Sequence, residues 1–128
     1  MFKVEAVTLA TRRATPQDIA ELERLVAAMK NPAASENDQL DLNLEFHSAI
    51  VQASHNRILR NLREQLRGVL SVMMNARQSQ ADHGMRIVST AMHEMLLQAI
   101  KERRPDRAQA VMLTHVQGAE RSLQTRPG

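Results

Sequence analysis

The chain has 128 residues, of which 43% are hydrophobic and 24% charged, values that fit one globular domain and exclude a disordered chain. With two Phe and no Tyr or Trp, Leu, Met and Ala must fill the core, and aromatic platforms for single-stranded nucleic acid are excluded. The net charge of +3 does not by itself mark a nucleic-acid-binding surface.

The composition also excludes several kinds of site and location. No Cys is present, so disulfides, thiolate metal sites and thiol catalysis are excluded. No apolar run approaches the roughly 20 residues that span a membrane, and the N-terminus lacks the apolar segment of a signal peptide. We therefore expect a cytoplasmic protein with no membrane partner.

Hydrophobic residues recur at helical spacing through the first half of the chain. The pattern predicts a helix over 2–14 and a second helix that begins at Thr15-Pro16-Gln17-Asp18, where Thr15 caps the helix and Asp18 closes a capping box. The second helix ends before Asn31-Pro32, because a residue that precedes Pro avoids the helical conformation. A third helix begins at 35–38 and ends at a break over 54–56.

The second half of the chain predicts three more helices. A long helix carries an apolar series at helical spacing, namely Ile58, Leu62, Leu66, Val69, Leu70 and Met73. The polar segment 78–84 is expected to be a loop before a fifth helix around 88–100, and 103–106 separates that helix from a sixth around 108–119. With only four Gly and four Pro for turns, the chain is expected to be an all-α antiparallel bundle of about six helices.

Three of the five His lie on apolar helix stripes: His47, His93 and His115. A buried imidazole needs a partner for each ring nitrogen, and a lone one usually finds it in a backbone carbonyl. Three such His on different helices allow a second interpretation, a shared binding site, because the inward stripes of a bundle converge. Asn43 lies one turn before His47 on the same face, so Asn43, His47, His93 and His115 are candidate metal ligands. Spacing alone leaves both interpretations open.

The remaining two His, His55 and His83, lie in predicted breaks between helices. We expect both to be solvated loop residues without a role in a site.

Sequence blocks around the three stripe His resemble the FCD domain, the C-terminal effector-binding domain of FadR-type GntR transcription regulators. Leu44-Glu45-Phe46-His47, Ala49-Ile50 and Ala53-Ser54-His55-Asn56 resemble the family signature D-x-x-F-H-x-A-I-x-x-A-S-G-N. His93-Glu94, Leu97 and Ala99-Ile100 are similar to E-H-x-x-I-x-x-A-I, and Pro105, Ala108, Met112 and His115 to G-D-P-x-x-A-x-x-A-M-x-x-H. The segment 9–15 is similar to L-A-A-x-R-A-T.

The resemblance implies that residues 1–128 form an effector-binding and dimerisation domain with a central pocket. In many members one Asp and three His hold a divalent metal there, and those positions fall on Asn43, His47, His93 and His115. The expected metal is zinc or nickel, with manganese as a further possibility, and a small carboxylate effector binds beside it. A homodimer is expected, and DNA is contacted only through an N-terminal winged helix-turn-helix domain that this chain lacks, which favours a fragment over a solitary effector domain.

Three departures from the family pattern bear on these expectations. Asn43 replaces the family's Asp, so a neutral amide oxygen stands where a carboxylate partly neutralises the cation, and metal affinity is expected to fall. Met92 replaces the Glu before the second His and alters the support of that ligand. Arg103-Arg104 replaces Gly-Asp before Pro105, which removes a helix cap.

Function hypotheses differ in what occupies the pocket. In the first, metal orients the effector and Arg67 or Arg77 grips its carboxylate, although a solvated helix face is the plainer interpretation of both Arg. In the second, the pocket binds its effector without metal and the His donate hydrogen bonds. A three-His metal hydrolase is the third, and it is disfavoured because no second acid or base lies at helical spacing from the His. We therefore predict a regulatory domain that is not an enzyme.

Overall fold

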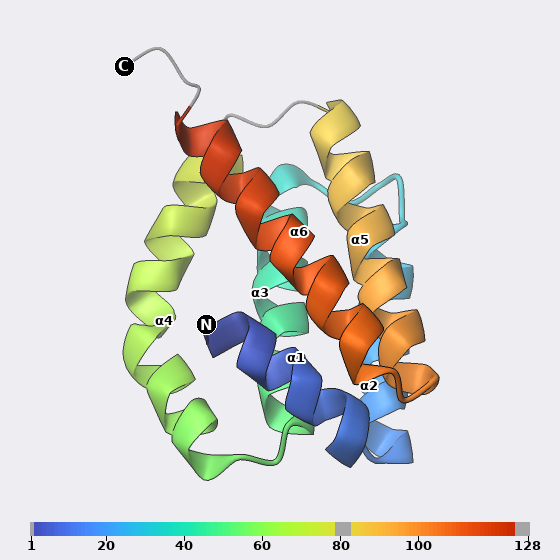
Figure 1. Ribbon diagram of the computed structural model, residues 1–128. Coiled ribbons are helices and arrows are strands. Elements are labelled where there is room, and N and C mark those ends of the chain that lie inside the picture. Colours follow the sequence, from blue (N-terminus) through green and yellow to red (C-terminus); the bar gives the residue numbers. More distant parts are fainter. Residues whose placement is uncertain (1, 79–82, 125–128) are drawn as a thin grey trace.

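The computed structural model describes residues 2–78 and 83–124, and these residues form six helices and no strand (Figure 1). The helices are α1 (Phe2–Arg13), α2 (Pro16–Met29), α3 (Glu36–Ala53), α4 (Arg57–Gln78), α5 (His83–Lys101) and α6 (Pro105–Gln124). The predicted all-α bundle is confirmed. None of the helices in the described ranges is both long enough and apolar enough to cross a membrane.

Two capping boxes fix where α2 and α3 begin. The Thr15 N–H donates to Asp18 Oδ2 at 2.8 Å, and the Asp18 N–H donates back to Thr15 Oγ1 at 3.1 Å. Ser35 and Asp38 form the same pair of bonds at 3.0 and 3.1 Å. These bonds from Ser35 lower the pKa of Asp38. Both helix starts thus occur where the sequence predicts them.

The core is built mainly from α1, α2, α3, α5 and α6. Helix α1 lies across the bundle against α6, α3 and α5, while α2 packs on α3 and α5 (Figure 1). Helix α4 packs chiefly on α3 and stands at the side of the bundle. The largest fully buried side chains are Phe46, Leu22, Leu25, Ile50, Leu96, Ile100 and Met112. Leu, Ile and Met thus fill the interior as the composition requires.

The predicted apolar stripe of α4 is described at two positions, and both are exposed, Ile58 at 76% and Leu62 at 37%. The side chains of Leu66, Val69, Leu70 and Met73 lie outside the described part of the structure. Leu59 packs into the core, and Val72 is 71% exposed. Helical spacing predicts the helix but does not show which of its faces is covered, and α4 packs chiefly on α3. The open apolar side chains are a surface feature that helical spacing alone does not reveal.

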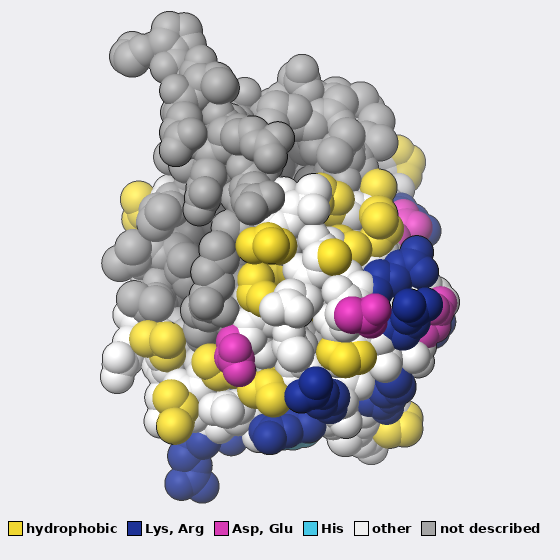
Figure 2. Space-filling view, viewed as in Figure 1, with side chains coloured by type: hydrophobic (Ala, Val, Ile, Leu, Met, Phe, Trp, Pro, Cys, Tyr) yellow, Lys and Arg dark blue, Asp and Glu magenta, His cyan; other side chains and the backbone are white. Residues whose placement is uncertain are grey.

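Basic side chains line the end of the bundle where several helices terminate. Figure 2 shows Lys and Arg gathered along the lower and right-hand edge of the described surface. Arg12 and Arg13 lie in the last turn of α1, and Arg103 and Arg104 lie in the α5–α6 turn. Cations at helix C-termini are favoured by the helix dipole, so this basic edge has a structural cause.

Two residues at helix C-termini adopt the left-handed conformation that favours Gly. They are His55, with φ of 50°, and Arg103, with φ of 57°. Arg103 donates through its guanidinium to the Thr11 and Ala14 carbonyl oxygens at 3.3 and 2.7 Å. Arg103, which stands where the family has Gly, therefore ties the end of α1 to the α5–α6 turn.

His55 is exposed and lies in the turn between α3 and α4, as predicted, but it also makes a contact between elements. Its Nε2 lies 2.7 Å from Asp18 Oδ2, and Arg13 donates to the Ser54 and His55 carbonyl oxygens at 3.3 and 3.4 Å. The α3–α4 turn is thereby connected to the end of α1 and the start of α2. His83 begins α5, so the predicted loop is shorter than 78–84; the side chain of His83 and residues 79–82 lie outside the described part.

Candidate metal and effector site

Helix α3 carries two of the four predicted ligands on its buried face. Asn43 and His47 are one turn apart, and only 7% and 5% of their surfaces are exposed. Phe46, beside His47, is fully buried and helps fix this face of α3 against the core. The helix therefore presents an amide and an imidazole to the interior of the bundle.

Helix α5 brings the third predicted ligand to the same place. His93 is 2% exposed, its ring centroid lies 5.6 Å from that of His47, and the two rings are nearly perpendicular at 77°. Phe46 packs on His93 with ring centroids 4.7 Å apart. Helices α3 and α5 thus bring His47 and His93 together, and Asn43 is buried one turn before His47.

The fourth predicted ligand, His115, lies on α6, and its side chain is outside the described part of the structure. Helix α6 packs against α5, so the backbone of α6 passes beside the helix that carries His93. The predicted central pocket and the place of His115 in it stay predictions.

The described donors are of kinds that bind a divalent ion, and two of them are close together. Imidazole nitrogens bond zinc at about 2.0–2.1 Å, so rings whose centroids are 5.6 Å apart are close enough to share one ion. Among the described side chains no group of three His, Cys, Asp or Glu is placed to hold a metal. Asn43 accounts for part of that result, because an amide stands where an Asp would complete such a group.

The carboxylates next to the two His point away from the site. Glu45 Oε2 lies 3.8 Å from Arg24, and Glu94 Oε1 lies 3.2 Å from Lys30, both at the surface. As the sequence suggested, neither acid shares a face with its neighbouring His. Neither is therefore placed to act as a general base at the buried imidazoles.

One buried arginine that contacts α3 was not predicted from the sequence. Arg63 on α4 is 4% exposed, and its guanidinium donates to the Leu44 carbonyl oxygen at 3.5 Å, the long limit of a hydrogen bond. One signal was available, because Arg63 lies one turn after Leu59, which is buried. The predicted effector residues Arg67 and Arg77 are on α4, with side chains outside the described part.

Comparison with known families identifies the domain. The family model of the FCD domain matches residues 2–118, nearly the whole chain. The chain belongs to the FCD domain family. The resemblance seen around His47, His93 and His115 is thus confirmed, and the bundle is the regulatory domain type found in GntR-type regulators.

Solved structures share the fold of this FCD domain. The GntR protein of Streptococcus agalactiae is 26% identical, with a TM-score of 0.73 over 94% of this chain and 53% of that chain. E. coli McbR/YncC is 23% identical, with a TM-score of 0.81 over 96% of this chain and 59% of that chain. The FCD domain therefore spans little more than half the length of these proteins. No curated protein matches the sequence.

Proposed function

We propose that this FCD domain senses a small organic acid bound beside a divalent metal at Asn43, His47, His93 and His115. The observation that carries the proposal is a pair of buried imidazoles from α3 and α5 with ring centroids 5.6 Å apart, with a buried amide one turn before the first. Burying three polar side chains in a Leu- and Met-rich core opposes stability unless they serve a ligand or one another.

The donor set favours a borderline metal and an anionic partner. Imidazole suits zinc and nickel, and manganese is the further candidate because Asn43 supplies an oxygen. Asn43 leaves the cation with one negative charge less than the family's Asp supplies. A carboxylate effector restores that charge, so metal and effector are expected to bind cooperatively.

Arg63 joins the residues that we propose for recognition of the effector. It is buried and contacts α3 at Leu44, next to Asn43 in sequence. A guanidinium grips a carboxylate with two parallel hydrogen bonds, which sets orientation as well as affinity. Arg67 and Arg77, one and several turns further along α4, stay candidates for the same role.

Regulation is expected to pass from the pocket to a separate DNA-binding domain. An effector that binds one arrangement of a homodimer better than another shifts the population toward that arrangement. The open apolar side chains of α4, Ile58 and Val72, are suited to contact a second copy. DNA would be contacted by a winged helix-turn-helix domain outside this chain, and the regulatory domain itself is not an enzyme.

A metal-free pocket is the second candidate, and Asn43 is the observation that favours it. A neutral amide at this position weakens the attraction for a dication, and the two His can donate hydrogen bonds to an acid directly. The two candidates differ in whether the effector requires metal.

Thermal unfolding with lactate, malate and citrate, each with zinc or with EDTA, tests the proposal. A ligand at 100 times its Kd stabilises a domain by about 2.7 kcal/mol. At least one acid should raise the Tm with zinc and less with EDTA, and Arg63→Lys should lower this shift while keeping bound metal. His55→Asn, outside the site, should keep the shift. Equal shifts with and without metal favour the metal-free pocket, and no shift with any acid contradicts both.

A further inference from the structure

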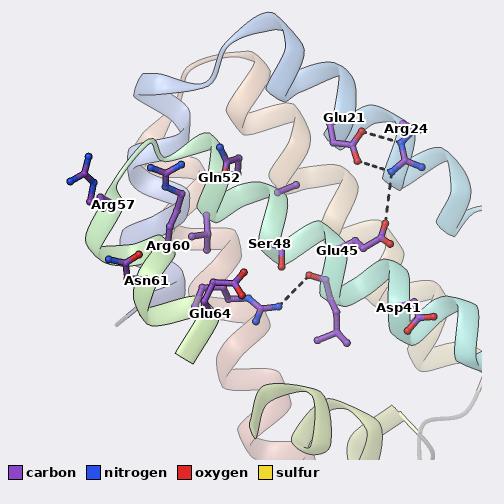
Figure 3. Close-up of a pocket in the computed structure, with 14 residues that line it drawn as sticks. Glu21, Arg24, Asp41, Glu45, Ser48, Gln52, Arg57, Arg60, Asn61 and Glu64 are labelled. Carbon is purple, nitrogen blue, oxygen red and sulfur yellow. Dashed lines mark hydrogen bonds and ion pairs between the residues drawn. The ribbon is translucent and has the colours of Figure 1, made fainter. Parts of the chain in front are cut away.

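A groove of about 1120 Å³ runs along the outer face of α3, between α2 and α4 (Figure 3). Its floor is α3, on which both α2 and α4 pack. Leu44 and Ser48 of α3 lie on this floor, on the helix that turns Asn43 and His47 to the core. The groove and the buried His pair are therefore on different faces of α3.

The two ends of the groove differ in charge. Figure 3 places Arg57 and Arg60 of α4 at one end and Glu21, Arg24 and Glu45 at the other. At the second end Arg24 is neutralised by Glu21 at 2.6 Å and approached by Glu45 at 3.8 Å. This contact with Arg24 lowers the pKa of Glu21.

Arg57 and Arg60 have no such partner among the described residues, in which neither takes part in an ion pair or a side-chain hydrogen bond. They are three residues apart and so are neighbours on the helix surface. The α4 wall of the groove carries three Arg against one acid, Glu64, the third being the buried Arg63. This wall has an excess of positive charge held on a rigid helix.

Neutral polar side chains also line the groove. Ser48 of α3 lies between the two ends, and Gln52 of α3 and Asn61 of α4 lie toward the end that holds Arg57 and Arg60 (Figure 3). No aromatic side chain is among the lining residues, so no base or ring finds a stacking surface there. Hydroxyl groups match this lining, since each can donate to a carboxylate or amide oxygen and accept from an amide or guanidinium.

We propose that this groove binds a small hydroxylated anion, with Arg57 and Arg60 holding its phosphate or carboxylate group and Gln52, Ser48 and Asn61 its hydroxyls. Two guanidinium groups one turn apart present paired donors to an oxyanion. The far acidic side chains accept from hydroxyls and repel a second anionic group, so a single anionic end is selected. The ligand bridges α3 and α4 outside the buried site.

Calorimetric titration of the EDTA-treated protein with glucose 6-phosphate and with glucuronate tests the groove separately from the metal site. At least one of them should bind saturably, and which one binds identifies the anionic group. Arg57→Gln/Arg60→Gln should weaken that binding at least tenfold, and raising the salt concentration should weaken it in the native protein. The matched double variant Arg12→Gln/Arg107→Gln loses the same charge from exposed positions outside the groove and should bind like the native protein.

A variant without the two amide side chains, titrated with the sugar anion and with inorganic phosphate, completes the test. Asn61→Ala/Gln52→Ala should weaken the sugar anion and leave inorganic phosphate unchanged; if both ligands are unaffected, the role of the amides is wrong. Failure of both sugar anions to bind, or affinity within twofold of native in the Arg57→Gln/Arg60→Gln variant, overturns the proposal. Circular dichroism and Tm establish that each variant is folded. Loss of the metal site leaves these results unchanged, because the titration contains no metal.

Discussion

At the scale of single residues, Asn43 decides what the buried site can do. It lies one turn from His47 on the interior face of α3, and His93 approaches from α5. The same position occupied by Asp would add a negative charge at a place with little access to water, where charge interactions are strong. In the proposed site, we therefore expect this one amide to weaken metal binding that a carboxylate would make tight.

The variant Asn43→Asp measures that difference. Zinc affinity is expected to increase roughly tenfold or more, which corresponds to about 1.4 kcal/mol or more, because a carboxylate neutralises part of the ion's charge. Competition with a chromophoric chelator gives both dissociation constants. Asp41→Asn, on the exposed face of the same helix, is the control and should leave zinc affinity as it is. Equal affinity in native and Asn43→Asp protein would place the metal elsewhere.

At the scale of helices, residues that break a local rule are held by contacts between elements. Arg103 takes a left-handed conformation that costs a non-Gly residue on the order of 1–2 kcal/mol. Its guanidinium offsets this cost by bonding the Thr11 and Ala14 carbonyl oxygens, at a helix end where carbonyls lack partners. The conformational cost and the hydrogen bonds can be separated by two substitutions.

Arg103→Ala is expected to lower the free energy of unfolding more than Arg103→Gly does, by about 1 kcal/mol. Both variants lose the two hydrogen bonds, but only Gly removes the conformational cost. Urea unfolding of both variants and of Arg104→Ala, whose exposed contact with Asp106 contributes little, checks this. If Ala and Gly were equivalent, the positive φ would carry no cost.

Helix boundaries were more predictable than helix contacts. Thr15 and Ser35 marked two helix starts because a capping box is read from residues three apart in the chain. The exposure of Ile58 and the burial of Arg63 could not be predicted, because both depend on where α4 lies relative to α3. Local signals define an element, whereas its covered face depends on packing between distant segments.

The same distinction between local signals and packing holds for the candidate sites. His47 and His93 could be paired from the sequence because apolar stripes on a bundle converge. The groove could not be predicted from the sequence, because it depends on how α2 and α4 flank α3. The same packing leaves Arg57 and Arg60 without an ion-pair partner among the described residues. The contact between His55 and Asp18, 37 residues apart, likewise required the tertiary structure.

At the scale of the whole molecule, carboxylates with lowered pKa make stability depend on pH. Burial alone would raise the pKa of Asp18, but hydrogen bonds from Thr15 and His55 and the charge of His55 outweigh it and lower the pKa. The same direction holds for Glu21 beside Arg24 and Asp38 beside Ser35. A lowered native pKa means that the unfolded chain binds more protons in acid.

Stability from these groups is present above their unfolded pKa, 3.8 for Asp18, and is lost as the pH falls through the lower native values. Urea unfolding between pH 6 and pH 2.5 should therefore show a steep loss below about pH 4. Asp18→Asn should be less stable than the native protein at pH 6, and the difference should shrink toward pH 2.5. A constant difference across this range would show that the charge of Asp18 does not matter.

We expect α3, α5 and α6 together to hold a divalent ion, and the metal content of the protein tests this most directly. Elemental analysis of protein purified without chelator should find about one zinc, nickel or manganese per chain, and clearly less in His93→Asn. A metal-free native protein that also takes up none of the three added ions would contradict the metal site, while leaving the fold and its family intact.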